Sequence, residues 1–253
     1  TDSDRVNHFL WPALGEPGHP LSGQALGLYR AMDGFLGRLW QRFGDEVQAG
    51  QASLMVAADH AFGPIRSEVY LNPWLRREGL LRVEGWELGP GHERIMPGSL
   101  ALALDPGRIY LHWAGRFPHG HLVPGPEAEQ ALDRIRQGLL DLRFQRVELG
   151  QGRPVARQEA PVAQVHLGRE LYHGPQAHLA PDLVAVAAPG FSLRAGLGRH
   201  DVFGQSHLTG THRPDGALAL CLPRPAGDLP ARVGGLYGLM RSLLGLDQRP
   251  WAG

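Results

Sequence analysis

The chain has 253 residues, of which 43% are hydrophobic and 20% are charged. A chain of this length can bury roughly 70–75% of the surface that it exposes when unfolded, so it needs no disulfide to stabilise a core. Its 25 basic and 25 acidic residues cancel. This balance argues against disorder, an electrostatic grip on nucleic acid and a polybasic membrane anchor. The composition therefore predicts an ordinary soluble globular protein.

The single cysteine and the short apolar runs bear on the cellular compartment and on membrane association. Cys221 stands in the run ALALCL, so an intrachain disulfide is excluded and the thiol is expected to be a small buried core residue. A reducing, cytoplasmic localisation fits this usage. The longest apolar runs, 183–188 and 217–222, are about a third of the roughly 20 residues that a membrane helix requires. We therefore expect no membrane partner.

In the first half of the chain, apolar residues recur at spacings of three and four after Ser22, which predicts an amphipathic helix over 23–43 that ends at Gly44. The run SLMVAAD at 53–59 predicts a buried central strand that delivers polar residues at its C-terminal end. A second helix is expected over 67–78.

In the second half, Pro106-Gly107 separates two apolar segments, 99–105 and 108–115, which predicts a hairpin. The stretch that opens at Pro126 predicts a helix, with acidic residues in the first turn and arginines later. Three further strands are expected at 160–168, 180–190 and 215–223, and a closing helix at 231–246. Strands that alternate with helices favour one α/β domain with a mostly parallel sheet covered on both faces and an antiparallel excursion.

Three short motifs pair acidic or imidazole groups with a tight turn. They are Asp4-x-x-x-His8, Asp59-His60 after the predicted strand, and Thr209-Gly-Thr-His212-Arg-Pro. Mixed carboxylate and imidazole ligands suit zinc or manganese. Each motif alone is also typical of solvated or helix-capping residues, so their order along the chain carries the argument.

In this order, and together with segments such as VYLNPWLRREGLL and RIYLHWAGRFPHG, the motifs resemble the alkaline phosphatase superfamily over essentially the entire chain. The resemblance is closest to its type I phosphodiesterase/nucleotide pyrophosphatase and phosphohydrolase/phosphomutase branch. It implies a three-layer αβα sandwich with two divalent metal ions, zinc or manganese, at the C-terminal edge of a parallel sheet. It also implies that Asp4, His8 and His212 hold one ion, and that Asp59 and His60 belong to the second.

The chain departs from the family pattern at its start. The pattern places a first strand with an aspartate, and a Thr or Ser nucleophile, before the Asp-x-x-x-His element, which here begins at residue 4. We therefore expect residues 1–253 to be the C-terminal portion of a single metallohydrolase catalytic domain, with a small antiparallel excursion around 99–180. Its second metal site is expected to be weak and the chain alone inactive. Among its own hydroxyls, Ser3, Ser206, Thr209 and Thr211 are candidate nucleophiles, but turn and cap hydrogen bonding is the better interpretation.

The expected activity is metal-dependent hydrolysis of phosphate mono- or diesters, with a small phosphate ester as substrate. Two alternatives stay open: a non-catalytic module that binds a metal or phosphate, and a phosphomutase or sulfatase-like relative. His119 and His121, in a Gly/Pro-rich stretch, could clamp a metal but are expected to lie in an exposed surface loop.

Overall fold

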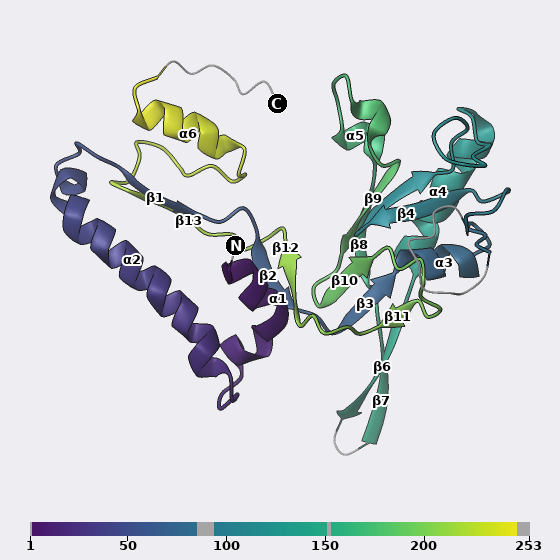
Figure 1. Ribbon diagram of the computed structural model, residues 1–253, viewed down its shortest axis with the longest axis horizontal. Coiled ribbons are helices and arrows are strands. Elements are labelled where there is room, and N and C mark those ends of the chain that lie inside the picture. Colours follow the sequence, from purple (N-terminus) through teal and green to yellow (C-terminus); the bar gives the residue numbers. More distant parts are fainter. Residues whose placement is uncertain (1, 85–93, 151–152, 247–253) are drawn as a thin grey trace. The chain divides into compact units, whose positions relative to one another are not determined.

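The computed structural model describes residues 2–84, 94–150 and 153–246 (Figure 1). These residues form two compact units, which are a first unit of residues 1–63 and 209–253 and a second unit of residues 64–208. Within the described ranges, no helix combines the length and the apolar composition that crossing a membrane requires.

The second unit contains a four-stranded antiparallel sheet in the order β4-β5-β9-β8. Its strands are β4 (Ala101–Asp105), β5 (Arg108–Leu111), β8 (Val162–Leu167) and β9 (Leu183–Ala187). A three-stranded sheet in the order β10-β3-β11 is formed by β3 (Ser67–Tyr70), β10 (Phe191–Arg194) and β11 (Phe203–Gly204). The remaining elements are α3 (Leu71–Arg77), α4 (Pro126–Asp141), the hairpin of β6 (Phe144–Gly150) and β7 (Arg153–Glu159), α5 (Gly168–Leu171) and a 3-10 turn (Ala177–Leu179).

The main hydrophobic core lies in the second unit, where α4 packs on β8, β5 and β9. Apolar residues of α4 recur at spacings of three and four, which places them on one face of the helix. The buried ones are Ala128, Ala131, Leu132, Ile135 and Leu139. Ile135 and Leu139 are fully buried, and each such side chain contributes about 1.5–3 kcal/mol through removal of apolar area from water.

The expected mostly parallel sheet is wrong. Among the described strand pairs whose register is defined, only β3 and β10 run parallel. The connections explain the difference, because neighbouring parallel strands need a crossover of a dozen or more residues, whereas a short turn gives an antiparallel pair. β4 and β5 are joined by such a turn. The chain does cross over through α4 after β5, but β6 then pairs with β7 instead of joining the sheet of β5. The fold is mixed α/β, as expected.

The first unit is built from two helices and two pairs of strands, with a third helix near the end of the chain. The helices are α1 (Asp2–Gly15), α2 (Ser22–Gln48) and α6 (Gly235–Leu243). The strands are β1 (Leu54–Ala57), β2 (Ala61–Pro64), β12 (Gly210–Arg213) and β13 (Ala219–Leu222). β1 pairs antiparallel with β13, and β2 pairs with β12.

Two expectations about burial in the first unit are wrong. Residues 54–57 are half-buried or exposed, because β1 has β13 as its neighbour in a two-stranded sheet and is not a central strand. The apolar stripe of α2 is also exposed, with 46% of Met32 and 39% of Trp40 accessible to solvent. Cys221 on β13 is buried, as predicted.

Several predicted elements are confirmed with shifted boundaries. α2 runs past Gly44, where a Cβ would lie 3.2 Å from the Trp40 ring, a tight contact. The hairpin at β4 and β5, the helix α4 and the strands β8, β9 and β13 lie where they were expected. The helix expected over 67–78 is wrong in its first turn, since Ser67–Tyr70 pairs with β10 as a strand and only Leu71–Arg77 is helical.

Candidate metal centre

The candidate site is built around a break in α1, which leaves a backbone carbonyl without its helical hydrogen bond. Pro12 has no N–H with which to bond the carbonyl of His8 four residues earlier, and its ring disfavours the regular helix there. Leu10 accordingly has non-helical backbone angles (φ −125°, ψ 26°). The sequence of α1 therefore leaves the carbonyl oxygen of His8 available to another part of the chain.

That carbonyl is used by the residue that precedes β12. The Thr209 backbone N–H donates to the His8 oxygen at 2.7 Å. The Thr209 hydroxyl oxygen accepts from the Trp11 backbone N–H at 3.1 Å and lies 3.3 Å from the same His8 oxygen. Thr209 thus caps both sides of the break in α1 and fixes β12 against it.

Gly210 allows this close approach. A Cβ built on Gly210 would lie 2.1 Å from the Asn7 carbonyl oxygen, so any side chain at this position would push β12 away from α1. The Gly210 carbonyl in turn accepts a hydrogen bond from His8 Nδ1 at 2.8 Å. Because a carbonyl oxygen only accepts, Nδ1 of His8 carries a proton. In the neutral imidazole the lone pair is then on Nε2.

Asp4, His8 and His212 meet at this junction, although His212 is 208 positions from Asp4. His212 Nε2 lies 2.9 Å from Asp4 Oδ1 and 3.1 Å from His8 Nε2, and His8 Nε2 lies 3.8 Å from Asp4 Oδ1. Asp4 and His8 share one side of α1 because they are four residues apart. The junction of α1 with β12 places His212 opposite them.

These three residues fit a divalent metal ion. Among the residues that the structure describes, theirs are the only three such donor atoms that lie together in one group, all within 4.8 Å of one another. Zinc bonds of about 2.0–2.2 Å in tetrahedral geometry put neighbouring ligand atoms roughly 3.3–3.6 Å apart, and the observed separations of 2.9–3.8 Å bracket that range. The hydrogen bond from Nδ1 of His8 to a carbonyl is the partner that metal-binding histidines usually have.

The electrostatics of the group favour an anionic Asp4. Burial by itself would raise the pKa of the Asp4 carboxyl. The hydrogen bond from His212 and the charges of His8 and His212 outweigh burial, so the pKa of Asp4 lies below its usual 3.8. The carboxylate is therefore negatively charged at neutral pH and can balance the charge of a cation.

His60 joins this group and Asp59 lies beside it. His60 directly precedes β2, which pairs with β12, and its ring stacks on that of His212 with 3.8 Å between centroids. Asp59 Oδ1 lies 3.7 Å from His60 Nε2, and 78% of the Asp59 side chain is exposed. The structure thus brings all five candidate ligands into one region of the first unit, with three in a tight group and two at its side.

Sequence reasoning missed a phenylalanine at the centre of this group. Phe62 on β2 makes edge contacts with the rings of His8, His60 and His212. Its position two residues after His60 was the available signal, because alternate residues of a strand share one face.

The candidate nucleophiles within the chain have other partners. Thr209 bonds to the backbone of α1, as described above. Ser206 lies in the second unit, where its hydroxyl donates to Glu68 Oε1 at 2.8 Å. The contacts of Thr209 fit the cap role expected for such hydroxyls. The Ser206 oxygen also accepts from the Leu208 backbone N–H at 3.2 Å, as in a turn, while its hydroxyl bonds to a buried carboxylate.

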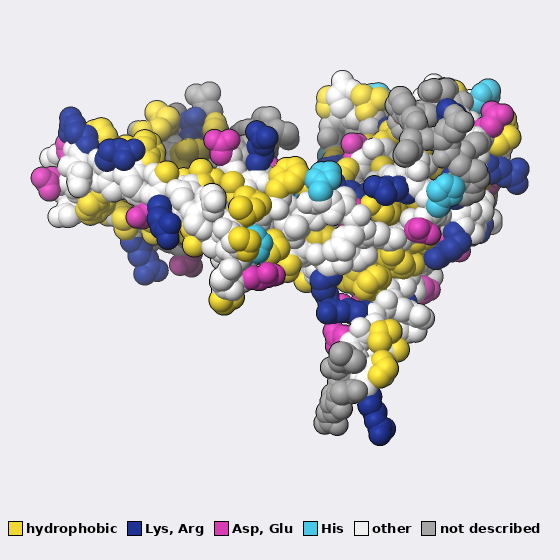
Figure 2. Space-filling model, turned by 60° about the horizontal axis from the view of Figure 1, so that its bottom comes forward, with side chains coloured by type: hydrophobic (Ala, Val, Ile, Leu, Met, Phe, Trp, Pro, Cys, Tyr) yellow, Lys and Arg dark blue, Asp and Glu magenta, His cyan; other side chains and the backbone are white. Residues whose placement is uncertain are grey.

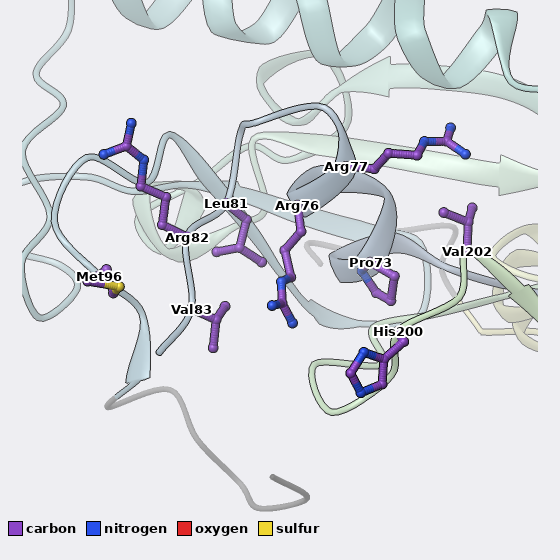
Figure 3. Close-up of a pocket in the computed structure, with 9 residues that line it drawn as sticks. All are labelled: Pro73, Arg76, Arg77, Leu81, Arg82, Val83, Met96, His200 and Val202. Atoms are coloured by element: carbon purple, nitrogen blue, oxygen red, sulfur yellow. The ribbon is translucent and has the colours of Figure 1, made fainter. Parts of the chain in front are cut away.

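A pocket of about 540 Å³ lies in the second unit, and none of the five candidate ligands lines it (Figure 3). The Arg76 side chain extends into this pocket on the side where His200 lies, whereas Arg77 points away (Figure 3). The walls are mostly apolar, and its described lining contains no carboxylate. The sequence motifs did not single out this cationic pocket.

Comparison with known proteins gave one family. The family model described as type I phosphodiesterase / nucleotide pyrophosphatase matches residues 1–215, a range that contains all five candidate ligands. No match was found among curated proteins or among solved structures.

Proposed function

Because this chain belongs to the type I phosphodiesterase/nucleotide pyrophosphatase family, we propose that it carries a metal centre for the hydrolysis of a small phosphate mono- or diester. Asp4, His8 and His212 hold one divalent ion in this proposal. Asp59 and His60 contribute to a second ion beside it. Zinc is the first choice and manganese the second, since both accept mixed carboxylate and imidazole ligands.

One observation carries the proposal. A carboxylate oxygen and two imidazole nitrogens from α1 and β12 converge within 4.8 Å, and backbone contacts of Thr209 and Gly210 hold the two elements together there. Three protein ligands are the usual number in a catalytic zinc site, because the fourth position is left open for water or substrate. Two ligands, Asp59 and His60, form a poorer site, so the second ion should bind more weakly.

The chemistry follows from this ligand set. Bound divalent ions stabilise the negative charge on a transferring phosphoryl group and lower the pKa of a bound attacking group. Asp4 stays ionised and balances that positive charge. His8 is held by Gly210 with Nε2 directed at the centre. The rings of His60, from the second motif, and His212, from the third, stack on each other and so lie on the same side of the site.

Metal binding is the first test. Titration of the metal-free chain with zinc in a calorimeter should show one tighter binding event. His212→Ala should weaken that event at least tenfold. Asp59→Asn should leave the tighter event nearly unchanged, and His19→Ala, a histidine of the first unit outside the group, serves as the control. Two equally tight events, or an unchanged affinity in His212→Ala, would contradict the assignment.

Hydrolysis is the second test. The complete product of the gene that encodes this sequence should release p-nitrophenol from a phosphate mono- or diester with zinc or manganese present. Asp4→Asn and His212→Ala should lower the rate by at least a hundredfold, whereas Asp33→Asn on α2 should not change it. Tight zinc binding without turnover of either ester would support the alternative of a non-catalytic binding module.

A further inference from the structure

The three imidazoles of the candidate centre come from three separate segments of the first unit. His8 is on α1, His60 precedes β2 and His212 is on β12. Their side chains are 24%, 28% and 49% exposed. His8 is hydrogen-bonded to Gly210 and His212 to Asp4, and packing against neighbouring side chains can restrict these rings further.

Phe62 is the side chain that all three imidazoles share. Its ring centroid lies 5.0 Å from that of His8, 5.4 Å from that of His60 and 4.9 Å from that of His212. The angles between the planes are 79°, 61° and 86°. These are the edge-to-face geometries that aromatic pairs prefer, and they lie in the usual 4.5–7 Å range.

Phe62 also contacts an aromatic residue of α1. The Trp11 ring stacks on it at 6.2 Å with 21° between planes, and the backbone N–H of Trp11 is bonded to Thr209. The same contacts that join α1 to β12 therefore also hold the ring against which the three imidazoles rest.

We propose that Phe62 is a positioning residue that orders His8, His60 and His212 for metal binding, an inference that rests on the proposed function. Phe62 offers no donor atom to a metal. It acts by restricting rotation of the three rings, so less conformational freedom is lost when the ion binds. Hydrogen-bonded partners that orient metal ligands change metal affinity by about 10–100-fold when they are replaced, and for a ring that orients them by packing we expect the lower end of that range.

The first measurement uses Co²⁺ as the probe, with a chelator in competition. Phe62→Leu, which keeps an apolar side chain but removes the ring, should weaken Co²⁺ binding at least tenfold. Phe62→Tyr, which keeps the ring, should stay within about threefold of the wild type. Val47→Ala removes buried side-chain volume from α2 of the same unit without touching the imidazoles, and should bind Co²⁺ like the wild type even though it is less stable.

The second measurement needs no metal. In the metal-free protein, proton NMR should show nuclear Overhauser contacts of the His212 ring with the rings of His8 and His60. These contacts involve no proton of residue 62, and they should be lost in Phe62→Leu and persist in Phe62→Tyr. If Phe62→Leu does not fold, Phe62→Met takes its place, with the amide signals of α2 in the same unit as the check on folding.

The outcomes separate the two proposals. Wild-type Co²⁺ affinity in Phe62→Leu, or equal weakening in Phe62→Leu and Phe62→Tyr, would overturn the positioning role. A wild-type chain that binds no Co²⁺ would overturn the metal assignment. The Overhauser contacts among the imidazoles would then decide whether Phe62 orders the three rings.

Discussion

Pro12 and Gly210 show how single residues build the candidate site without binding anything. Pro12 leaves the carbonyl of His8 without its helical partner, and the N–H of Thr209 takes that place. Gly210 lets the backbone of β12 come close enough for this bond and for the bond from Nδ1 of His8. The positions of His8 and His212 therefore depend on backbone features of residues that lie outside the ligand set.

The substitution Gly210→Ala tests this dependence. Its Cβ would meet the Asn7 carbonyl at 2.1 Å, so β12 has to move and the hydrogen bond from His8 is lost. We expect zinc affinity to fall at least tenfold and the protein to lose about 1–3 kcal/mol of stability, the range for a disrupted buried hydrogen bond. Calorimetric zinc titration and urea denaturation measure the two effects.

Gly27→Ala is the matched control. A Cβ at Gly27 meets nothing within 4 Å, and glycine inside a helix costs roughly 0.5–1 kcal/mol relative to alanine. This variant of α2 should be slightly more stable and bind zinc normally. Equal zinc affinity in the two variants would show that the approach of β12 to α1 does not position the ligands.

Thr209 offers a subtler test at the same junction. Thr209→Val keeps the shape of the side chain but removes the oxygen that accepts from the Trp11 N–H. A donor left without its partner costs about 1–3 kcal/mol, so the midpoint of urea unfolding should fall. Thr209→Ser retains the hydroxyl and should recover most of the loss. A Val variant as stable as the Ser variant would rule out this capping role.

The sequence motifs predicted the candidate ligands more fully than their surroundings. Asp4 and His8 are recognisable because their spacing of four is visible along the chain, and His212 because it follows a Thr-Gly turn. The roles of Phe62 and Gly210 depend on which segments pack together in three dimensions. One-dimensional spacing carries no record of such packing, so the contacts of these two residues became visible only in the structure, although Gly210 stands inside the third motif.

At the level of elements, periodicity predicted the type of most helices and strands but not their partners. The apolar runs of β8 and β9 identify strands, yet such runs suit a parallel or an antiparallel neighbour. Only for β4 and β5 did the Pro106-Gly107 turn also predict the partner. The segment 67–70 was expected to be helical, and it forms a strand because β10 and β11 offer it hydrogen-bonding partners on both sides. Such tertiary pairing overrides a weak local preference.

A buried charge network holds β3 to β10. Glu68 on β3 is 1% exposed. Its carboxylate accepts hydrogen bonds from the Tyr70 hydroxyl at 2.6 Å, the Arg194 guanidinium at 3.1 Å and the Ser206 hydroxyl at 2.8 Å. Burial raises the pKa of Glu68, but these hydrogen bonds and the charge of Arg194 outweigh it, so the pKa lies below its usual 4.5. The folded state therefore favours the ionised carboxylate.

This shift predicts a pH dependence of stability. The unfolded chain binds the proton first as the pH falls, because its Glu68 has the ordinary, higher pKa. The contribution of Glu68 is complete above the usual pKa of 4.5 and is lost as the pH falls through the folded pKa. Glu68→Gln should lower the free energy of unfolding at pH 7 by about 1–3 kcal/mol, less than for a fully buried ion pair because Arg194 is partly exposed.

Urea denaturation at pH 7 and at successive acidic pH values provides the measurement. The gap in stability between the wild type and Glu68→Gln should narrow below the usual pKa of 4.5. Glu148→Gln on the exposed hairpin of β6 and β7 should differ little from the wild type at any pH. A gap that stays constant down to acid unfolding would show that ionisation of Glu68 does not stabilise the sheet.

At the scale of the whole molecule, the two units differ in how well they cover apolar surface. The main cluster of buried hydrophobic residues lies in the second unit. In the first unit, α2 has 27 residues, and its buried ones are Ala25, Gly44 and Val47. Five large side chains of α2 are between 36% and 53% exposed, namely Tyr29, Met32, Phe35, Trp40 and Phe43. Figure 2 shows hydrophobic side chains interspersed with arginines on the surface of this part of the chain.

These five residues form one stripe along α2. At 100° per residue they fall within an arc of roughly 140°, which is the width of a face that normally packs on a core. Contiguous exposed apolar surface of this kind is rare in monomeric soluble proteins. We therefore expect the chain to bind the dye ANS in its folded state and to self-associate as its concentration rises, which fluorescence and light scattering would measure.

Substitutions on the stripe should remove both properties at little cost in stability. Because Met32 and Phe35 are about half exposed, changing both to Gln removes apolar surface from solvent contact and loses few packing contacts, so unfolding should shift by less than about 1 kcal/mol. Val147→Gln, at an isolated exposed position on β6 that is 68% accessible, should leave ANS binding unchanged. ANS fluorescence that drops equally in both variants would point to a source other than α2. If the Met32 and Phe35 double variant unfolded at a much lower urea concentration, that result would show that the stripe of α2 packs against other residues in solution and is not exposed to solvent.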